Sequence, residues 1–277
     1  MISSFVITFR ETLEAALIVG IILAYLVKTK KERYNNIVYI AIVSAVAASI
    51  ISALLFNAFA GGFEGRAEQI FEGVSMLFAS FLLTFMILWM LKQKHIVTDL
   101  HKKVSIELKE EHKFGLFSLV FISVLREGIE TVIFLGAAKL ASSDNNIIGA
   151  SLGIIFAIIF GYILFVIGKK IDIKMFFNIT SILLILFAAG LVAHGIHEFQ
   201  EAGVLPTYIE HVWDINPKQN PDGSYPLLHE NGFIGGLAKD LFGYNGNPSL
   251  LEVISYIGYL IVIGILWKNI NRIHRII

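Results

Sequence analysis

The sequence contains no cysteine among its 277 residues, and its five prolines all lie between positions 206 and 248. The absence of cysteine excludes disulfides, thiolate metal ligands and cysteine nucleophiles. Charged residues are scarce, at 16% of the chain, and acidic and basic residues balance at 22 each, so no overall field would attract nucleic acid. Apolar residues are in excess, at 56% with a mean hydropathy of +0.73. This composition is typical of a polytopic membrane protein surrounded by lipid.

Seven segments are long and apolar enough to cross a membrane as helices, which requires about 20 residues. The predicted spans are 3–27, 37–59, 69–91, 115–138, 147–168, 176–198 and 249–268. Only the first and fourth contain several charged residues in their interior. The N-terminus has no basic residue ahead of its apolar run, so we interpret it as the first span rather than a cleaved signal. The sequence therefore predicts an all-α membrane protein whose single transmembrane domain covers residues 1–277.

The distribution of lysine and arginine predicts the orientation of these spans. Sixteen of the 22 basic residues lie in alternate connections, those that follow the first, third, fifth and seventh spans. Basic connections favour the cytoplasmic side, which places the N-terminus outside and the C-terminus inside. The proline-containing and acidic segment 199–248 is then an extracytoplasmic loop, and segment 92–113 is predicted to be an exposed cytoplasmic helix.

One charged segment occurs twice. RETLEAALIVG at 10–20 has a counterpart in REGIETVIFLG at 126–136, with arginine, both glutamates and the last glycine at matching offsets. The separation equals three spans, and because three is odd the second copy is inverted in the membrane. We therefore predict two repeats, 1–91 and 115–198, followed by the last helix, 249–268. Inverted repeats build the central binding sites of many secondary transporters, so the pattern indicates transport.

The repeated segment carries the chemistry. On a helix, Arg10, Glu11 and Glu14 share one face, and the first and last of these can pair at i,i+4. An ionised side chain at the membrane centre costs about 2.5–3.5 kcal/mol, so these groups must face one another or water. One alternative is a structural lock of two Arg–Glu pairs. However, four glutamates and two arginines leave two surplus negative charges, which favours a site for a hard cation with oxygen ligands. The predicted metal ligands are Glu11, Glu14, Glu127 and Glu130, with Arg10 and Arg126 as cations that tune the site.

A second polar group lies at the outer ends of the third and sixth spans. EGRAEQIFEG at 64–73 places glutamates at i, i+4 and i+8, and HGIHEFQE at 194–201 adds two histidines and two glutamates. Ordinary solvation and helix-packing histidines are the alternatives. Because both segments lie on the outer face, we favour a capture site for the incoming ion. The predicted capture residues are Glu68, Glu72, His197, Glu198 and Glu201. Met76, Met86 and Met90 in the third span are interpreted as filler of the bundle rather than ligands.

Two R-E-x-x-E segments in helices one and four of a seven-span chain resemble the high-affinity iron permeases, the oxidase-linked iron transporters of fungi and bacteria. EQIFEG at 68–73 and LFGYNGNPSLLEVISYIGY at 241–259 are also similar to segments of that family, although Thr12 replaces its usual glycine. The resemblance implies that the chain imports iron, as Fe²⁺ or Fe³⁺, across a bacterial inner membrane, with no bound organic cofactor. It also implies an extracytoplasmic partner, either a ferroxidase or a periplasmic iron-handling protein.

Two rival functions stay open at this point. The same architecture suits another hard divalent cation, such as manganese or lead. A membrane-bound di-iron enzyme also uses glutamate-rich helices, but such sites add Glu-x-x-His motifs, whereas the eight histidines here are scattered.

Overall fold

The computed structural model describes residues 1–92, 100, 102, 104–106, 113–141, 146–165, 173–220 and 222–276. Within these ranges the regular elements are all helices, which confirms the predicted all-α class. The long helices are α1 (Ile2–Lys28), α2 (Asn35–Ala60), α3 (Arg66–Lys92), α5 (Lys113–Ala141), α6 (Asn146–Phe165), α7 (Ile173–Glu201) and α9 (Leu250–Ile276). A 3-10 turn, η1 (Glu32–Tyr34), precedes α2, and a short helix, α8 (Phe233–Phe242), lies in segment 199–248.

Each predicted span lies on one of the long helices. Helix α9 continues eight residues past the predicted end of the last span at 268, and the last three residues of the fifth predicted span, 166–168, lie outside the described residues. Helix α8 was not predicted from the sequence. It follows Gly232 and ends at Gly243, whose φ of +65° is the left-handed conformation that glycine adopts at helix C-termini. The predicted cytoplasmic helix over 92–113 falls mostly outside the described residues.

Five helices of the described chain are long and apolar enough to span a membrane by themselves. They are Glu32–Ala60, Arg66–Met90, Ile147–Phe165, Met175–Glu201 and Leu250–Ile270. Their outward side chains include large exposed apolar groups such as Val43, Phe81 and Ile261, as expected for a surface in contact with lipid. Helices α1 and α5 do not meet the same criterion because the repeated charges lie in their interiors. The seven-span count and the orientation therefore stay predictions.

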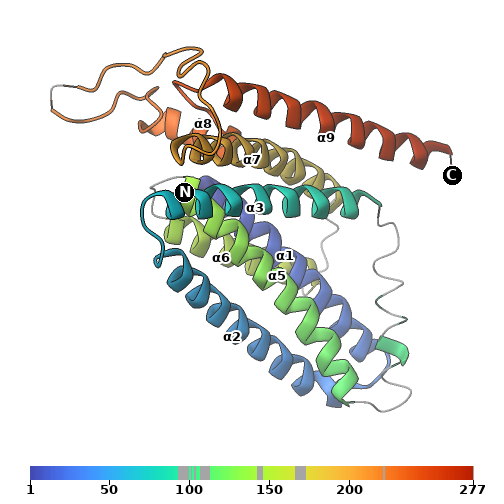
Figure 1. The fold of residues 1–277 in the computed structure, drawn as a ribbon. Helices are drawn as coiled ribbons and strands as arrows, with labels where there is room; N and C mark the ends of the chain where they lie inside the picture. The colour runs from blue at the N-terminus through green and yellow to red at the C-terminus, as the bar shows by residue number, and fades with distance from the viewer. Residues whose placement is uncertain are drawn as a thin grey trace.

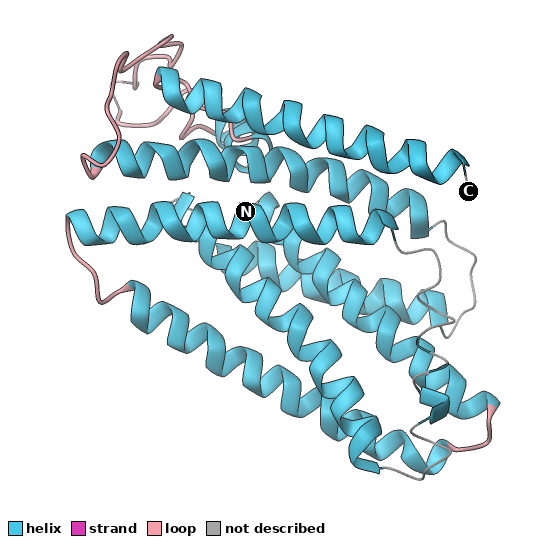
Figure 2. Cartoon of the chain, turned by 45° about the vertical axis from the view of Figure 1, so that its right-hand side comes forward, coloured by secondary structure: helices cyan, strands magenta, loops and turns pink. Residues whose placement is uncertain are grey.

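The helices form two groups (Figures 1 and 2). Helices α3, α7 and α9 lie side by side in one group, with the loop 202–249 and α8 gathered at one end. Helices α1, α2, α5 and α6 form the other group, in which α1 packs on α6 and α2 packs on α5. Helices α1 and α5 also contact each other and join the two groups, because α5 packs on α3 and α1 on α7. The two repeated segments thus occupy the centre of the bundle.

Two apolar cores flank this centre. The first contains Ile7 of α1 and Phe134 of α5, packed against α3 and α7. The second contains Ile22 of α1 and Val124 of α5, packed against α2. Along both helices the charged segments, 10–14 and 126–130, fall between the residues of the two cores. The polar centre is therefore closed by apolar packing toward both ends of α1 and α5.

Helix α6 lies against the backbone of α1 at Gly153. A Cβ atom added to this glycine would lie 2.6 Å from the carbonyl oxygen of Phe5 and 2.9 Å from the backbone nitrogen of Phe9. Nearby, the hydroxyl of Thr8 donates a hydrogen bond to the carbonyl oxygen of Ala150 at 3.0 Å. The added Cβ would also meet the Thr8 hydroxyl, which can rotate, but the two backbone atoms cannot move away, so the close approach of α1 and α6 requires a glycine.

We expect Gly153→Ala to lower the thermal unfolding temperature of the detergent-solubilised protein, because overpacking costs about 1–3 kcal/mol. Gly258→Ala is the matched control, since it is the same change within a helix and no atom lies within 4 Å of the added Cβ. Alanine favours a helix over glycine by up to about 1 kcal/mol, so the control should be neutral or stabilising. Equal shifts for the two variants would show that the α1–α6 contact is not tight.

Candidate functional site

The charged residues of α1 form a connected group within the helix. Arg10 Nη1 lies 3.1 Å from Glu11 Oε1, and Nη2 lies 3.0 Å from Glu14 Oε1. The side chains of Arg10 and Glu11 are completely buried. The i,i+4 spacing brings Glu14 back over the same guanidinium, as the helical repeat requires.

The charged residues of α5 repeat this arrangement in a more open setting. Arg126 Nη2 lies 2.8 Å from Glu127 Oε1, and Nε lies 3.3 Å from Glu130 Oε1. Glu127 is buried, whereas 44% of the Arg126 side chain is exposed. The two copies of the segment therefore have the same Arg–Glu ion pairs but differ in how much of the arginine side chain is exposed.

The two segments meet across the α1–α5 contact. Carboxylate oxygens of Glu11, Glu14 and Glu127 all lie within 4.8 Å of one another, and all three residues are buried. Glu130 lies outside this tight group. It is nevertheless close enough to interact electrostatically with Glu11 and with Glu14. Three of the four predicted ligands thus converge on one point, and the fourth borders it.

Several carboxylate oxygens at this point lack a hydrogen-bond partner. Within the described chain, Glu11 Oε2, Glu127 Oε2 and Glu130 Oε2 are buried and accept no hydrogen bond. A buried polar atom without a partner costs about 1–3 kcal/mol, and more when it is charged. Two guanidinium groups cannot neutralise four carboxylates. The geometry therefore leaves acceptor oxygens free for a cation, and oxygen donors of this kind suit hard or borderline divalent metals.

Two consecutive residues near the end of α3 contact the two arginines, which the sequence did not reveal. Arg10 Nη2 donates a hydrogen bond to Met90 Sδ at 2.8 Å, and the guanidinium of Arg126 lies over the ring of Trp89, 5.1 Å from its centre. Met76 and Met86 are buried in the first apolar core, as filler would be. Met90 also packs against this core, but in addition it is a direct partner of the charged site. No sequence signal distinguishes it, because the register of α3 against α1 is a tertiary property.

The predicted outer residues come together where the beginning of α3 lies beside the end of α7. His197 Nε2 lies 3.2 Å from Glu201 Oε1, and Gln69 Nε2 donates to Glu201 Oε2 at 3.0 Å. The charges of Glu68, Glu72 and Glu201 all act on Glu198. The helices can approach this closely because Gly73 and Gly195 face each other. We call Glu68, Glu72, His197, Glu198 and Glu201 the outer cluster.

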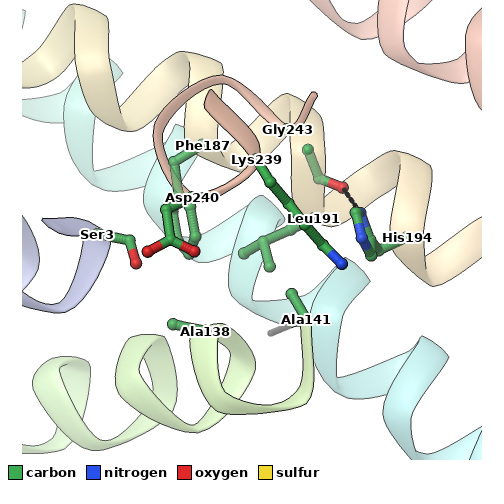
Figure 3. A pocket seen from close by; sticks show the side chains of 10 residues that line it. Ser3, Ala138, Ala141, Phe187, Leu191, His194, Lys239, Asp240 and Gly243 are labelled. Carbon is green, nitrogen blue, oxygen red and sulfur yellow. Dashed lines mark hydrogen bonds between the residues drawn. The ribbon is translucent and has the colours of Figure 1, made fainter. Parts of the chain in front are cut away.

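The side chain of His194, one turn before His197, does not point toward the outer cluster. It is bonded to the carbonyl oxygen of Gly190 through Nδ1 at 3.2 Å and lines a small pocket of about 20 Å³, the size of one water molecule. Figure 3 shows Lys239 and Asp240 of α8 and Ser3 of α1 around the same pocket. A half-buried histidine that packs beneath α8 matches the alternative of a helix-packing residue.

Comparisons with known proteins identify the family of the chain. A model of the iron permease FTR1 family matches residues 1–275. An uncharacterized protein of Archaeoglobus fulgidus is 32% identical over 274 residues, which cover 99% of this chain and 97% of that protein. The ferrous iron permeases EfeU of Escherichia coli O6:H1 and of Yersinia pestis are each 33% identical over 267 residues, which cover 94% of this chain and 93% and 91% of theirs. No solved structure matches the chain.

These matches confirm the resemblance predicted from the doubled R-E-x-x-E segments. They also remove the di-iron enzyme as an alternative, because the family consists of transporters. The chain is accordingly a multi-pass protein of the cell membrane. With one family model covering nearly its full length and relatives above 30% identity along it, this chain belongs to the iron permease FTR1 family.

Proposed function

We propose that the chain imports ferrous iron through a carboxylate site between α1 and α5. The observation that carries this proposal is the convergence of Glu11, Glu14 and Glu127 within 4.8 Å in a buried position. With Glu130 included, four carboxylates and two guanidinium groups leave a net charge of −2, which one divalent cation neutralises. The relatives named as ferrous iron permeases support the same oxidation state. Manganese or lead has the same charge, and competition with iron uptake in proteoliposomes decides between them.

The proposed site lies at the centre of an inverted repeat of two halves, 1–91 and 115–198, in a seven-span chain with its N-terminus outside. Two sets of contacts support this symmetry. Helix α1 of the first half packs on α6 of the second, and α5 of the second half packs on α2 of the first. A Cβ atom added at Gly20 would meet the ring of Phe165, and one added at Gly136 would meet the ring of Phe56. Corresponding glycines of the two segments thus have corresponding partners.

We further propose that the outer cluster captures the ion before it reaches the central site. The cluster and the central site lie toward opposite ends of α3, since Glu72 and Met90 are eighteen residues apart, or about 27 Å along the helix. The first apolar core occupies the interval, with Met76 and Leu83 of α3 among its members. An ion captured outside can therefore reach the central site only when this core parts. Helix movement of this kind is typical of alternating access.

The two arginines have different roles in this mechanism. Arg10 is completely buried and bonded to Glu11, Glu14 and Met90, so it is a fixed counter-charge that holds the carboxylates together. Arg126 is partly exposed and stacked on Trp89, so it can swing away and free the oxygens of Glu127 and Glu130. Stacking of this type contributes about 0.5–1 kcal/mol at exposed sites, which is weak enough to be broken in each cycle.

An extracytoplasmic ferroxidase or iron-handling partner fits the same scheme. The described residues of loop 202–249 lie at the end of the molecule that carries the outer cluster (Figure 1), and exposed acidic residues such as Glu210 and Asp214 are among them.

We expect Glu14→Gln and Glu130→Gln each to abolish Fe²⁺ uptake into proteoliposomes, because each removes a negative charge from the proposed cage. Both variants should insert and elute as the wild type does on size exclusion. Glu210→Gln is the matched control, since this exposed glutamate belongs to the outer loop and not to the cage. Uptake that persists in both cage variants would show that the ion does not pass between α1 and α5.

Removal of the two arginines should have unequal effects on stability. Arg10→Gln leaves buried carboxylates without a cation, which costs about 3–5 kcal/mol of unfolding free energy. Arg126→Gln should cost less, because 44% of the Arg126 side chain is exposed whereas Arg10 is completely buried. Thermal unfolding of the two variants in detergent measures the difference. Equal losses would contradict the assignment of a fixed and a movable arginine.

Neutralising the outer cluster should weaken capture without stopping transport. We expect Glu72→Gln and Glu198→Gln to raise the KM for Fe²⁺ several-fold while kcat stays near the wild-type value. Glu64→Gln is the control in the loop just before α3, because Glu64 is exposed and its charge is not among those that act on Glu198. An unchanged KM in the first two variants would exclude the outer cluster from the uptake route.

A further inference from the structure

Glu252, in the first turn of α9, is the most enclosed acidic residue next to the outer cluster. Only 3% of its side chain is exposed. Both of its oxygens are occupied: Oε1 accepts hydrogen bonds from His197 Nδ1 at 3.0 Å and from the backbone nitrogen of Ser249 at 3.2 Å, and Oε2 accepts one from Asn245 Nδ2 at 2.8 Å. One buried carboxylate thus connects α9, the outer loop and α7.

The contact between Glu252 and His197 determines which nitrogen of the His197 ring carries the hydrogen. An ionised carboxylate has acceptors only, so the hydrogen of the contact must belong to Nδ1 of the histidine. The opposite ring nitrogen, Nε2, then points toward Glu201, with 3.2 Å between Nε2 and Oε1. A histidine that binds a metal through one nitrogen usually donates its other N–H to a carboxylate in this way. The arrangement presents Nε2 to the outer cluster as a ligand atom.

A capping role explains only part of this geometry. Ser249 and Glu252 form a capping box at the start of α9, in which Glu252 N also donates to Ser249 Oγ at 3.3 Å. Such a box needs one carboxylate oxygen and the first turn of a single helix. It does not require a histidine from α7 on the same oxygen, an amide from the loop on the other, or nearly complete burial.

We propose that Glu252 is a positioning residue that aims Nε2 of His197 into the outer cluster and so sets the affinity with which that cluster captures Fe²⁺. This inference rests on the proposed capture role of the outer cluster. Glu252 binds no iron itself, because its oxygens are already occupied. Through Asn245 it also makes the geometry of the cluster depend on the loop that carries α8.

The test is a double-mutant cycle between Glu252→Ala and His197→Ala, with Fe²⁺ uptake measured in proteoliposomes under reducing conditions. Loss of an outer-shell partner of this kind weakens metal affinity about 10–100-fold, so each single variant should raise KM by about tenfold or more with kcat unchanged. The double variant should be no worse than His197→Ala alone. Glu252→Gln keeps a carbonyl acceptor for Nδ1 and should restore most of the affinity.

Ser249→Ala is the matched control, because it removes the cap hydroxyl and leaves the contact between Glu252 and His197. Its KM should stay within about twofold of the wild type, as expected for a change that leaves a ligand and its outer-shell partner in place. Two outcomes would show that Glu252 is only a helix cap. One is that the increases in KM caused by Glu252→Ala and His197→Ala multiply in the double variant. The other is that Ser249→Ala raises KM as much as Glu252→Ala does. An unchanged KM in His197→Ala would instead overturn the capture role itself, while the central cage is tested separately by Glu14→Gln.

A measurement on the unmutated protein covers the case in which Glu252→Ala does not fold. In protein labelled with ¹⁵N-histidine and loaded with Zn²⁺ as a diamagnetic probe, His197, assigned by its loss in His197→Ala, should keep its proton on Nδ1 and bind the metal through Nε2. Coordination through Nδ1, or no metal-induced shift of either nitrogen, would overturn the proposal.

Discussion

Six ionisable side chains on two helices in the middle of an apolar bundle are the constraint on which the rest of this structure depends. At about 2.5–3.5 kcal/mol for each charge at the membrane centre, α1 and α5 are unfavourable as isolated spans. They become favourable only where their charged faces meet and lipid is excluded from both. Four other helices provide most of that exclusion and leave Arg126 half exposed: α2 and α6 cover one side of the pair, and α3 and α7 approach from the other. The cores around Ile7 and Ile22 then close the polar centre from either end.

The surplus of carboxylate over guanidinium distinguishes this centre from a structural lock. A lock is most stable when every buried charge has a partner, because an unpaired buried charge costs more than a pair contributes. Here Glu11 and Glu127 each leave one buried oxygen without a hydrogen bond. Such an arrangement is unfavourable in the empty protein and favourable when a cation is bound. In the proposed function, the binding energy of the ion is therefore available to stabilise a conformation in which the cage is closed around it.

Sequence and structure differ most clearly in the symmetry of the two copies. The segments around Arg10 and Arg126 match residue by residue, and the sequence alone predicted both the internal pairing and the meeting of α1 with α5. The unequal surroundings of the two arginines could not be predicted. They depend on α3, which contacts Arg126 through Trp89 and Arg10 through the next residue, Met90. Helical periodicity gives the buried face of α3 but not its register against another helix. Glu252 was missed for a related reason, since Ser249-x-x-Glu252 has the pattern of an ordinary capping box.

The unequal surroundings also favour one direction for the proposed movement of α3. One helix, α3, contributes to the outer cluster through Glu68 and Glu72, to the first apolar core through Met76 and Leu83, and to the central site at its far end. A shift of α3 relative to α1 and α5 therefore changes all three regions at once. Because Arg10 is buried and multiply bonded, such a shift meets most resistance at Met90 and least at the exposed stack of Trp89 and Arg126. In the proposed mechanism, opening of the first core toward the outer cluster is thus coupled, through α3, to the position of Arg126, the more exposed of the two arginines.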